Sequence, residues 1–123
     1  MQFSAPSVVN HYLAEHAQLL LCSYQRLTGK VLMSDASPQA LYEAPFCLVS
    51  HNTAVDPIFN YANQTALALF DMQWRDFTQL PSRLSAANVN RAERARLLAA
   101  VASDGFIDDY AGERVSSTGQ RFW

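Results

Sequence analysis

One stretch of the sequence decides the fold, and it reads Ile58-Phe59-Asn60-Tyr61-Ala62-Asn63-Gln64-Thr65-Ala66-Leu67-Ala68-Leu69-Phe70. Its first half alternates the large apolar residues Phe59 and Tyr61 with smaller or polar ones, as a half-buried strand does. Asn63 is a residue type that caps helices, and the apolar residues after it predict a short helix through Phe70. The stretch therefore predicts a strand that passes directly into a helix at Asn63.

The residues before this stretch predict its partner strand. Phe46 to His51 is a short apolar run rich in strand-forming residues, and a polar loop containing Pro57 follows it. We therefore predict a hairpin of two strands. Residues 31–45 show only a short helical turn at Gln39 to Tyr42 and are interpreted as a connector.

An amphipathic helix is predicted nearer the N-terminus. Apolar residues recur at intervals of three and four from Val8 to Leu27, which is the spacing of one helix face. Ser7 is expected to cap its start and Gly29 to end it. The chain thus divides into an N-terminal helix, a connector and a core domain, at residues 1–30, 31–45 and 46–123.

Further helices are predicted after Phe70. Trp74 to Leu80 has the pattern of a short helical turn. A longer helix is expected to start at Asn90, which opens a capping-box pattern, and to end at Gly105 in a left-handed cap.

The end of the chain is predicted to be strand. Phe106 to Ser117 is expected to form one long strand with a break at Gly112, and Ser117 to Gly119 a turn into residues 120–123. Strands and helices are segregated along the chain, so the predicted fold class is α+β, with an antiparallel sheet covered by helices.

Composition limits the class of protein. The chain has 123 residues, of which 50% are hydrophobic and 16% charged, which suits one compact domain. Its net charge of −2 favours neither nucleic acid nor an anionic membrane as a partner. Cys22 and Cys47 lie in apolar runs, where we expect free thiols that pack as small apolar side chains. No signal peptide or membrane span is predicted, so we expect a cytoplasmic protein.

Several runs of residues resemble a known family. The strand that ends in Asn63, and the ending from Gly119 to Trp123, are similar to motifs of PAS domains. A closer resemblance is to the MEKHLA domain, a PAS-like family of bacterial proteins and of the C-terminus of plant homeodomain leucine-zipper regulators. The runs that carry it are Ser50-His51-Asn52, Asp56-Pro57-Ile58-Phe59-Asn60-Tyr61-Ala62-Asn63, Leu80-Pro81-Ser82-Arg83-Leu84-Ser85, Asn90-Arg91-Ala92-Glu93-Arg94 and Gly105-Phe106-Ile107-Asp108-Asp109-Tyr110.

The resemblance implies a PAS-like sensing or interaction module with no settled catalytic activity. Members of the family continue beyond the position of Trp123, through the rest of that strand and one further strand, and both lie in the middle of the sheet. We therefore expect a truncated form of the domain, or sheet edges that a partner covers, because unpaired strand edges are unfavourable.

PAS domains hold ligands between the sheet and the helices, in a mostly apolar space with a few polar groups. The positions expected near that space are Val49, Phe59, Asn60, Tyr61, Leu67, Phe70, Leu97, Val101, Phe106, Tyr110 and Arg114. The alternative is that the apolar members only fill the core. For Arg114 the alternative is a cross-strand pair with Asp108 or Asp109.

The residues present disfavour two cofactors of PAS domains. Haem needs an axial ligand, commonly histidine, and the helix expected over residues 90–104 contains none. Photoactive flavin domains carry an Asn-Cys-Arg-Phe run where this chain has Leu80-Pro81-Ser82-Arg83-Leu84, which lacks the adduct-forming thiol. Flavin binding without photochemistry stays open, and the cofactor, if any, stays unknown.

No catalytic or metal site is predicted. Ser50, His51 and Asp56 are the residue types of a hydrolytic triad, but neighbours on a strand point to opposite faces. An enzyme that uses Asp108 or Asp109 as its acid is the least favoured alternative, because these neighbours also point apart.

Two functions remain as hypotheses. The first is a sensory or regulatory module that binds a small apolar or mixed-polarity molecule, or whose interior its own side chains fill. The second is a ligand-free interaction or dimerisation module that uses the N-terminal helix and the sheet. Nucleic acid is not expected as a partner, because Arg91, Arg94 and Arg96 have no aromatic residues beside them on which bases could stack.

Overall fold

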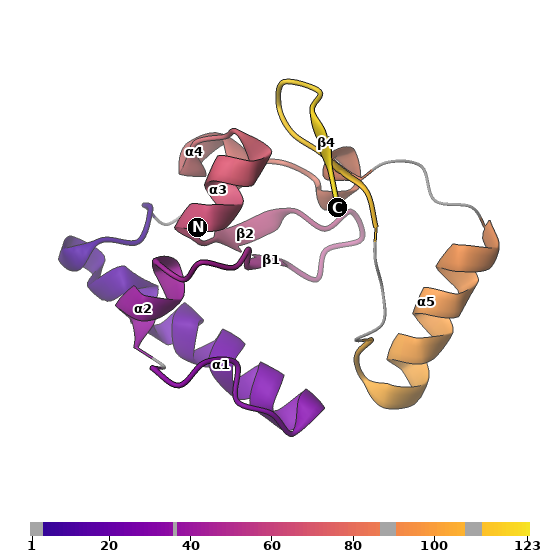
Figure 1. Cartoon of the computed structure of the whole chain (residues 1–123), viewed down its shortest axis with the longest axis horizontal. Coiled ribbons are helices and arrows are strands. Elements are labelled where there is room, and N and C mark those ends of the chain that lie inside the picture. The colour runs from indigo at the N-terminus through magenta and orange to yellow at the C-terminus, as the bar shows by residue number, and fades with distance from the viewer. Residues whose placement is uncertain (1–3, 36, 87–90, 108–111) are drawn as a thin grey trace.

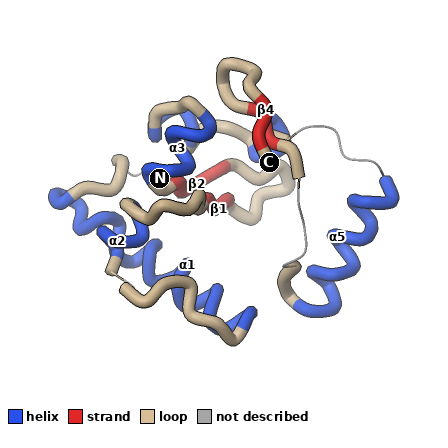
Figure 2. The backbone as a smooth tube through the Cα atoms, viewed as in Figure 1, coloured by secondary structure: helices blue, strands red, loops and turns tan. Residues whose placement is uncertain are grey.

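Figure 1 shows a computed structural model of the chain, which describes residues 4–35, 37–86, 91–107 and 112–123. Helices and two antiparallel strand pairs make up the fold, which confirms the α+β class (Figure 2). The elements in chain order are η1 (Val8–Leu13), α1 (Ala14–Thr28), α2 (Pro38–Tyr42), β1 (Val49–His51), β2 (Phe59–Ala62), α3 (Gln64–Phe70), α4 (Trp74–Phe77), η2 (Ser82–Ser85), α5 (Arg91–Asp104), β3 (Arg114–Val115) and β4 (Arg121–Phe122).

The stretch that decides the fold forms β2, the cap residue Asn63 and α3, as predicted. Asn63 is fully buried, and its Oδ1 accepts hydrogen bonds from the amides of Ala66 (3.1 Å) and Leu48 (3.0 Å). Its Nδ2 donates to the carbonyls of Phe46 (2.7 Å) and Leu41 (3.3 Å). One buried amide thus caps α3 and also ties it to the chain before β1, with all its hydrogen bonds made.

β1 and β2 form the predicted antiparallel hairpin, with Ser50 opposite Tyr61. The register shifts between Ser50 and His51, as in a β-bulge. β1 is shorter than the predicted strand, because the side chain of Asn63 takes the Leu48 amide that a longer strand would present to a neighbour.

The C-terminal strands form a second pair, β3 and β4, which is separate from the first. The predicted turn between them is confirmed, and Gly119 has a φ of +83°, which glycine adopts readily. The predicted long strand from Phe106 is wrong within the described residues: β3 is limited to two residues, and Phe106 lies in irregular backbone. β3 pairs with the equally short β4, and its Arg114 also forms an isolated antiparallel bridge with Ala86.

The N-terminal helix is interrupted, which corrects the predicted continuous helix from Val8. His11, Tyr12 and Leu13 all have a positive φ, of 54°, 54° and 53°. The regular α-helix therefore begins only at Ala14.

The side chain of Asn10 holds the short turn that precedes this interruption. The Oδ1 atom of Asn10 accepts a hydrogen bond from the Ser7 amide (2.9 Å), and its Nδ2 donates to the carbonyl of Ala5 (2.9 Å). The bond from Ser7 is half of a capping box at the start of η1, so it supports the first helical turn. The predicted end of α1 is confirmed, because Gly29 takes a left-handed conformation with a φ of 71°.

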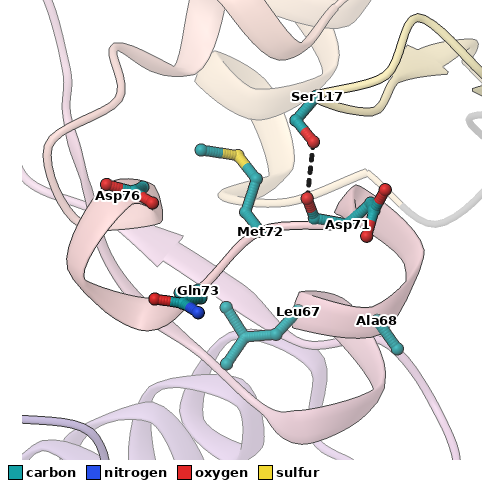
Figure 3. Close-up of a pocket in the computed structure, with 7 residues that line it drawn as sticks. All are labelled: Leu67, Ala68, Asp71, Met72, Gln73, Asp76 and Ser117. Atoms are coloured by element: carbon teal, nitrogen blue, oxygen red, sulfur yellow. Dashed lines mark hydrogen bonds between the residues drawn. The ribbon is translucent and has the colours of Figure 1, made fainter.

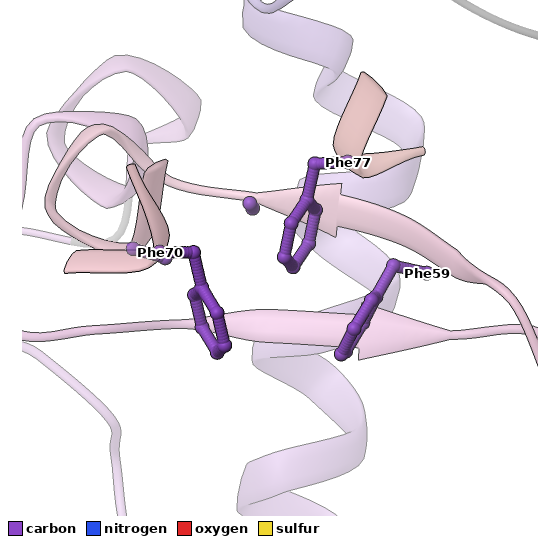
Figure 4. Close-up of a cluster of buried hydrophobic side chains, with 5 residues drawn as sticks. Phe59, Phe70 and Phe77 are labelled. Atoms are coloured by element: carbon purple, nitrogen blue, oxygen red, sulfur yellow. The ribbon is translucent and has the colours of Figure 1, made fainter. Parts of the chain in front are cut away.

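Three clusters of buried apolar side chains form the core. The first is aromatic, and its rings of Phe59 and Phe77 stack with centroids 4.2 Å apart (Figure 4). Phe70 packs on Phe77 with a centroid distance of 5.3 Å. The other two clusters join α1 to the hairpin, α4 and α2, and consist of Leu13, Tyr61 and Trp74, and of Ala17, Leu21 and Leu41.

The apolar side of α1 is only partly used in this packing. Ala17 and Leu21 are buried against Leu41 of α2, whereas Leu19 is 58% exposed and Leu27 46% exposed. The predicted apolar stripe is thus continuous in sequence, but the rest of the domain covers only some of its side chains.

Both cysteines are free and exposed, which corrects the expectation that they pack as apolar side chains. In each apolar run a neighbour is turned inward instead: Leu21 is buried beside Cys22, and Leu48 is half-buried beside Cys47. Successive residues on a helix or strand face different directions, so a local apolar run does not bury all its members.

α5 stands apart from the other helices in Figure 1. None of its described side chains is buried, and Leu98 is 59% exposed. Its predicted end is confirmed by Gly105, with a φ of +83°, whereas the predicted start at Asn90 lies outside the described residues. Among the described helices, none is long and apolar enough to cross a membrane.

Candidate functional site

An open pocket with a volume of about 770 Å³ lies where α3 and α4 meet the turn between β3 and β4 (Figure 3). It has an apolar part and a polar part. Its lining residues are Leu67, Ala68, Asp71, Met72, Gln73, Asp76 and Ser117.

The end of α3 positions the polar part of the pocket. Asp71 is the C-cap of α3 in a left-handed conformation, with a φ of 54°. The Ser117 hydroxyl donates to the Asp71 carbonyl (2.5 Å), and the Ser117 amide donates to the Phe70 carbonyl (2.9 Å). These two bonds fasten the turn between β3 and β4 to α3. One wall of the pocket therefore comes from α3 and α4, and the other comes from this turn.

The apolar part of the pocket continues into the core. Leu67 and Met72 are half-buried and pack against the aromatic cluster that contains Phe70. Phe122 of β4 also packs on Phe70, edge to face, with a centroid distance of 5.0 Å. A molecule in the pocket would therefore lie directly against side chains that hold the C-terminal pair in place.

The pocket is acidic, because Asp71 and Asp76 both line it. The ion pairs found among the described residues join Asp56 to Arg83 (3.1 Å) and Glu113 to Arg121 (3.5 Å). Within the described chain, neither pocket carboxylate has a basic partner.

A second group of polar atoms lies between α1 and the hairpin. The Tyr61 hydroxyl is buried and has no hydrogen-bond partner among the described residues. His16 stacks on its ring with a centroid distance of 5.4 Å, and Trp74 meets it edge-on at 5.8 Å. Burial raises the pKa of Tyr61, and the nearby Tyr42 raises it further, so the phenol stays protonated.

His16 also connects α1 to β1. The Ser50 hydroxyl donates to Oδ1 of Asn60 (2.5 Å), and it lies 3.0 Å from Nε2 of His16. Because the serine hydrogen points to Asn60, the Nε2–H of His16 is the donor in the second bond. Burial lowers the pKa of His16, since a charged imidazolium would lose hydration there.

The structure brings together about half of the residues predicted for the ligand space. Phe59, Tyr61 and Phe70 are buried in the core clusters, and Val49 packs against the cluster that contains Phe59 and Phe70. Leu67 is the one described member of the predicted set that also lines the pocket.

The remaining predicted residues lie elsewhere. Leu97 and Val101 are on α5, outside the three core clusters, and Val101 is 46% exposed. Phe106 is half-buried in the segment after α5, and Tyr110 lies outside the described residues. The prediction that α5 lines the same space as β2 therefore has no support in the packing of its described side chains.

Arg114 has a partner that the sequence did not indicate. Its Nη1 donates to the hydroxyl of buried Ser85 (3.0 Å), which ties β3 to η2. Partial desolvation of the Cys47 thiol raises its pKa, although the residue is exposed overall, and the positive charge of Arg114 lowers that pKa by a smaller amount. The predicted partners Asp108 and Asp109 lie outside the described residues.

The structure separates the three residue types of the hydrolytic alternative. Ser50 bonds to Asn60, while Nδ1 of His51 lies 2.7 Å from the carbonyl oxygen of Asn52. Asp56 pairs with an arginine, as described above. No group of three or more potential metal ligands occurs in the described parts of the chain.

Sequence reasoning missed most of the pocket. Its acidic residues are the C-cap of α3, Asp71, and Asp76 in the first turn of α4, and polar residues at helix ends are common enough to carry no signal. The wall formed by Ser117 comes from a contact 46 residues away along the chain, which no local pattern predicts.

These features define a small α+β domain with a helix ahead of an antiparallel hairpin. A family model for the MEKHLA domain matches residues 14–123. The chain therefore belongs to the MEKHLA domain family, as the sequence resemblance predicted. The family is PAS-like, which supports a sensory or regulatory module. No curated protein matches the sequence significantly.

Proposed function

We propose that this MEKHLA domain senses a small molecule of mixed polarity, held against α3 and α4 on the helical side of the β1–β2 hairpin. The observation that carries the proposal is the pocket, in which Leu67 and Met72 provide an apolar wall and Asp71, Gln73 and Ser117 provide polar groups. Ligand sites of this kind combine apolar contact with a few polar groups that orient the ligand.

The position of the pocket supports a regulatory role. Its walls come from α3 and α4 on one side and from the β3–β4 turn, through Ser117, on the other. A ligand that contacts both walls stabilises the docked position of the C-terminal pair by mass action. Occupancy is thus converted into a change in how firmly β3 and β4 are held, which a partner of the protein can read.

Filling the pocket tests the proposal. Ala68 lines the pocket and is exposed, so Ala68→Phe places a ring in it without disturbing the core. The neighbouring Leu69 is exposed and outside the lining, so Leu69→Phe is a matched control. Native mass spectrometry of the purified protein should show a retained small molecule on the wild type and on Leu69→Phe, and lose it on Ala68→Phe. Equal retention by both variants contradicts this site, and retention by none of the three proteins argues against ligand sensing.

The proposal requires no catalytic step. It places the protein in the cytoplasm, and the free, exposed thiols of Cys22 and Cys47 support a reducing compartment. Nucleic acid and membranes are not part of the proposal, as the net charge of −2 supports.

Dimerisation is the second candidate, and exposed apolar side chains near the N-terminus favour it. Val8 and Val9 of η1 and Leu19 of α1 are 74%, 92% and 58% exposed. Against it, the buried side of α1 already packs within its own domain. Sedimentation velocity over a hundredfold range of concentration tests it, because Leu19→Glu should abolish a concentration-dependent dimer and Gln18→Glu should not. A monomer at every concentration removes this candidate.

A further inference from the structure

Residues 4–13 form a strap that lies over one of the core clusters. Ala5 and Leu13 of the strap pack in the cluster that contains Tyr61 and Trp74. Figure 1 shows this segment, in indigo, beside α2, which it contacts. The strap is thus part of the cover of a buried aromatic surface.

The hydrogen bonds of the strap hold it together without fastening it to the elements it covers. The Asn10 side chain bonds to the backbone of Ser7 and Ala5. The Tyr12 amide donates to the Ser7 carbonyl (2.8 Å). In the described chain, no hydrogen bond or ion pair joins the strap to α2, the hairpin or α4, and the contacts that dock it are apolar and aromatic, such as that of Tyr12 with Tyr42 (ring centroids 6.3 Å apart). The strap can therefore leave these elements as a unit.

The strap joins α1 through three residues in an unfavourable backbone conformation. His11, Tyr12 and Leu13 have φ values of 54°, 54° and 53°. Residues other than glycine adopt this left-handed conformation at a cost in free energy, and rarely in succession. Such strain persists only where surrounding contacts hold it. A return to right-handed backbone would relieve the strain and continue α1 towards Val8.

A continuous helix is an available alternative for these residues. In it, Leu13 stays four residues before Ala17, on the helix face that α1 already buries. Val9, which is 92% exposed in the docked strap, would extend that face by one turn. The bond between the Ser7 amide and the Asn10 side chain suits the first turn of a helix. The undocked strap would thus keep both its cap and its apolar face.

The cluster below the strap also favours opening. The Tyr61 side chain is fully buried, and its hydroxyl has no hydrogen-bond partner in the described chain. A buried polar group without a partner is unfavourable, and contact with water satisfies it. Undocking removes Ala5 from this cluster and admits water to it. The docked state is therefore disfavoured both at the junction with α1 and in the core.

We propose that residues 4–13 are a two-state strap. In the docked state the strap covers the cluster of Tyr61 and Trp74, with a left-handed break at residues 11–13. In the open state the break becomes right-handed, α1 continues to Val8, and water reaches the Tyr61 hydroxyl. A molecule that binds only one of these states shifts the population towards it. The strap is thus a conformational switch that does not depend on the pocket.

Two substitutions at His11 test the left-handed break. His11 is exposed, so His11→Gly and His11→Ala remove the same side chain and differ only in backbone preference. Glycine favours the left-handed docked state, and alanine favours the continuous helix. Relaxation-dispersion NMR on the full ¹⁵N-labelled chain measures the ratio of open to docked molecules at the amides of residues 8–16. This ratio should be at least about tenfold higher in His11→Ala than in His11→Gly.

Gln18 provides the matched control. It is exposed and lies within α1, where both states have the same right-handed backbone. Gln18→Gly and Gln18→Ala should therefore give equal ratios of open to docked molecules. If they differ as much as the two His11 variants do, the effect is one of general helix stability and the inference is wrong.

Tyr61→Phe tests the contribution of the core. The substitution keeps the ring that stacks on His16 and removes the hydroxyl that has no partner. The docked state should gain, so that the ratio of open to docked molecules falls at least about threefold. A ratio that stays the same or rises overturns the inference, because the buried hydroxyl then does not favour opening.

A nuclear Overhauser contact between the rings of Tyr12 and Tyr42 identifies the docked state directly. It should be weaker in His11→Ala than in His11→Gly, because fewer molecules are docked. If this contact is equal in the two variants and neither shows exchange at residues 8–16, the strap has a single state and the inference is wrong.

Discussion

The two parts of this domain differ in how they are held. Among the described residues, every buried apolar side chain lies between Pro6 and Phe77. After residue 86, the buried side chain that the structure describes is Ser116, a polar one. The N-terminal part therefore has a core of its own, whereas the C-terminal part depends on contacts with that core.

This difference indicates where regulation can act. The C-terminal pair is fastened through Ser117 to the end of α3, through Phe122 to Phe70, and through Arg114 to Ser85. Regions with few buried contacts open with a lower free energy than the core does. The pocket lies at the border of the two parts, where a ligand can change the attachment of one without unfolding the other.

The largest expected effect comes from the aromatic cluster. Phe77→Ala removes a fully buried ring that contacts both Phe59 and Phe70, and should lower the free energy of unfolding by about 3 to 5 kcal/mol. Urea denaturation followed by far-UV circular dichroism measures it. Leu98→Ala, on exposed α5, should change stability by less than about 0.5 kcal/mol. If Phe77→Ala and Leu98→Ala lower the free energy of unfolding by similar amounts, the N-terminal and C-terminal parts do not differ in packing.

Asn63 should show the next largest effect. Asn63→Ala removes the cap of α3 and leaves buried backbone groups at Leu48 and Phe46 without partners, at a cost of about 2 to 3 kcal/mol. Asn63→Asp keeps the oxygen that caps α3, and when protonated it has a single O–H donor in place of the two bonds from Nδ2, so at low pH it should fall between the wild type and Asn63→Ala. The same urea titrations measure both variants. If Asn63→Ala leaves the free energy of unfolding almost unchanged, Asn63 does not join these elements as described.

Phe122 tests the attachment of the C-terminal pair. Phe122→Ala removes the edge-to-face contact with Phe70 and should lower the opening free energy of β3 and β4 by about 1 kcal/mol. Hydrogen exchange should become faster at Ser116 and Ser117 and stay the same in β1 and β2. Trp123→Ala is the control, because Trp123 is 82% exposed. Faster exchange throughout the chain would show that the two parts unfold together.

The smallest effect should come from His16 and depend on pH. Its pKa in the folded chain lies below the ordinary value of 6.5, so the unfolded chain binds more protons near and below that pH. The stability that neutral His16 contributes is complete above pH 6.5 and is lost as the pH falls through its folded pKa. Thermal unfolding between pH 5 and 8 should show this loss in the wild type and a flatter profile in His16→Gln. His51→Gln, at an exposed position of β1, is the control and should keep the wild-type dependence of stability on pH. If His51→Gln also flattens this dependence, the effect comes from the net charge of the protein and not from His16.

Much of the local structure was predictable from the sequence. The alternation of Phe59 and Tyr61 predicts β2, the capping preference of Asn63 predicts the start of α3, and Gly29 and Gly105 predict two helix ends. Each of these depends on a residue and its near neighbours in the chain, which is why pattern reasoning succeeds there.

The errors have physical causes that local patterns do not contain. The break before Ala14 lies at His11, Tyr12 and Leu13, whose backbone has a positive φ that the apolar spacing does not indicate. Part of the apolar stripe of α1 is exposed because periodicity reports that a helix face can be buried, without reporting that a neighbour is there to cover it.

The sequence by itself determined the fold class, the MEKHLA family, and the hairpin and helix at its centre, because these follow from periodicity, capping and recognisable runs of residues. Only the tertiary structure decided the pocket, the partner of Arg114 and the bond between His16 and Ser50. The physical reason is distance along the chain: Ser117 meets Asp71 across 46 residues and His16 meets Ser50 across 34. Such contacts form only when packing of the whole core has brought the elements together.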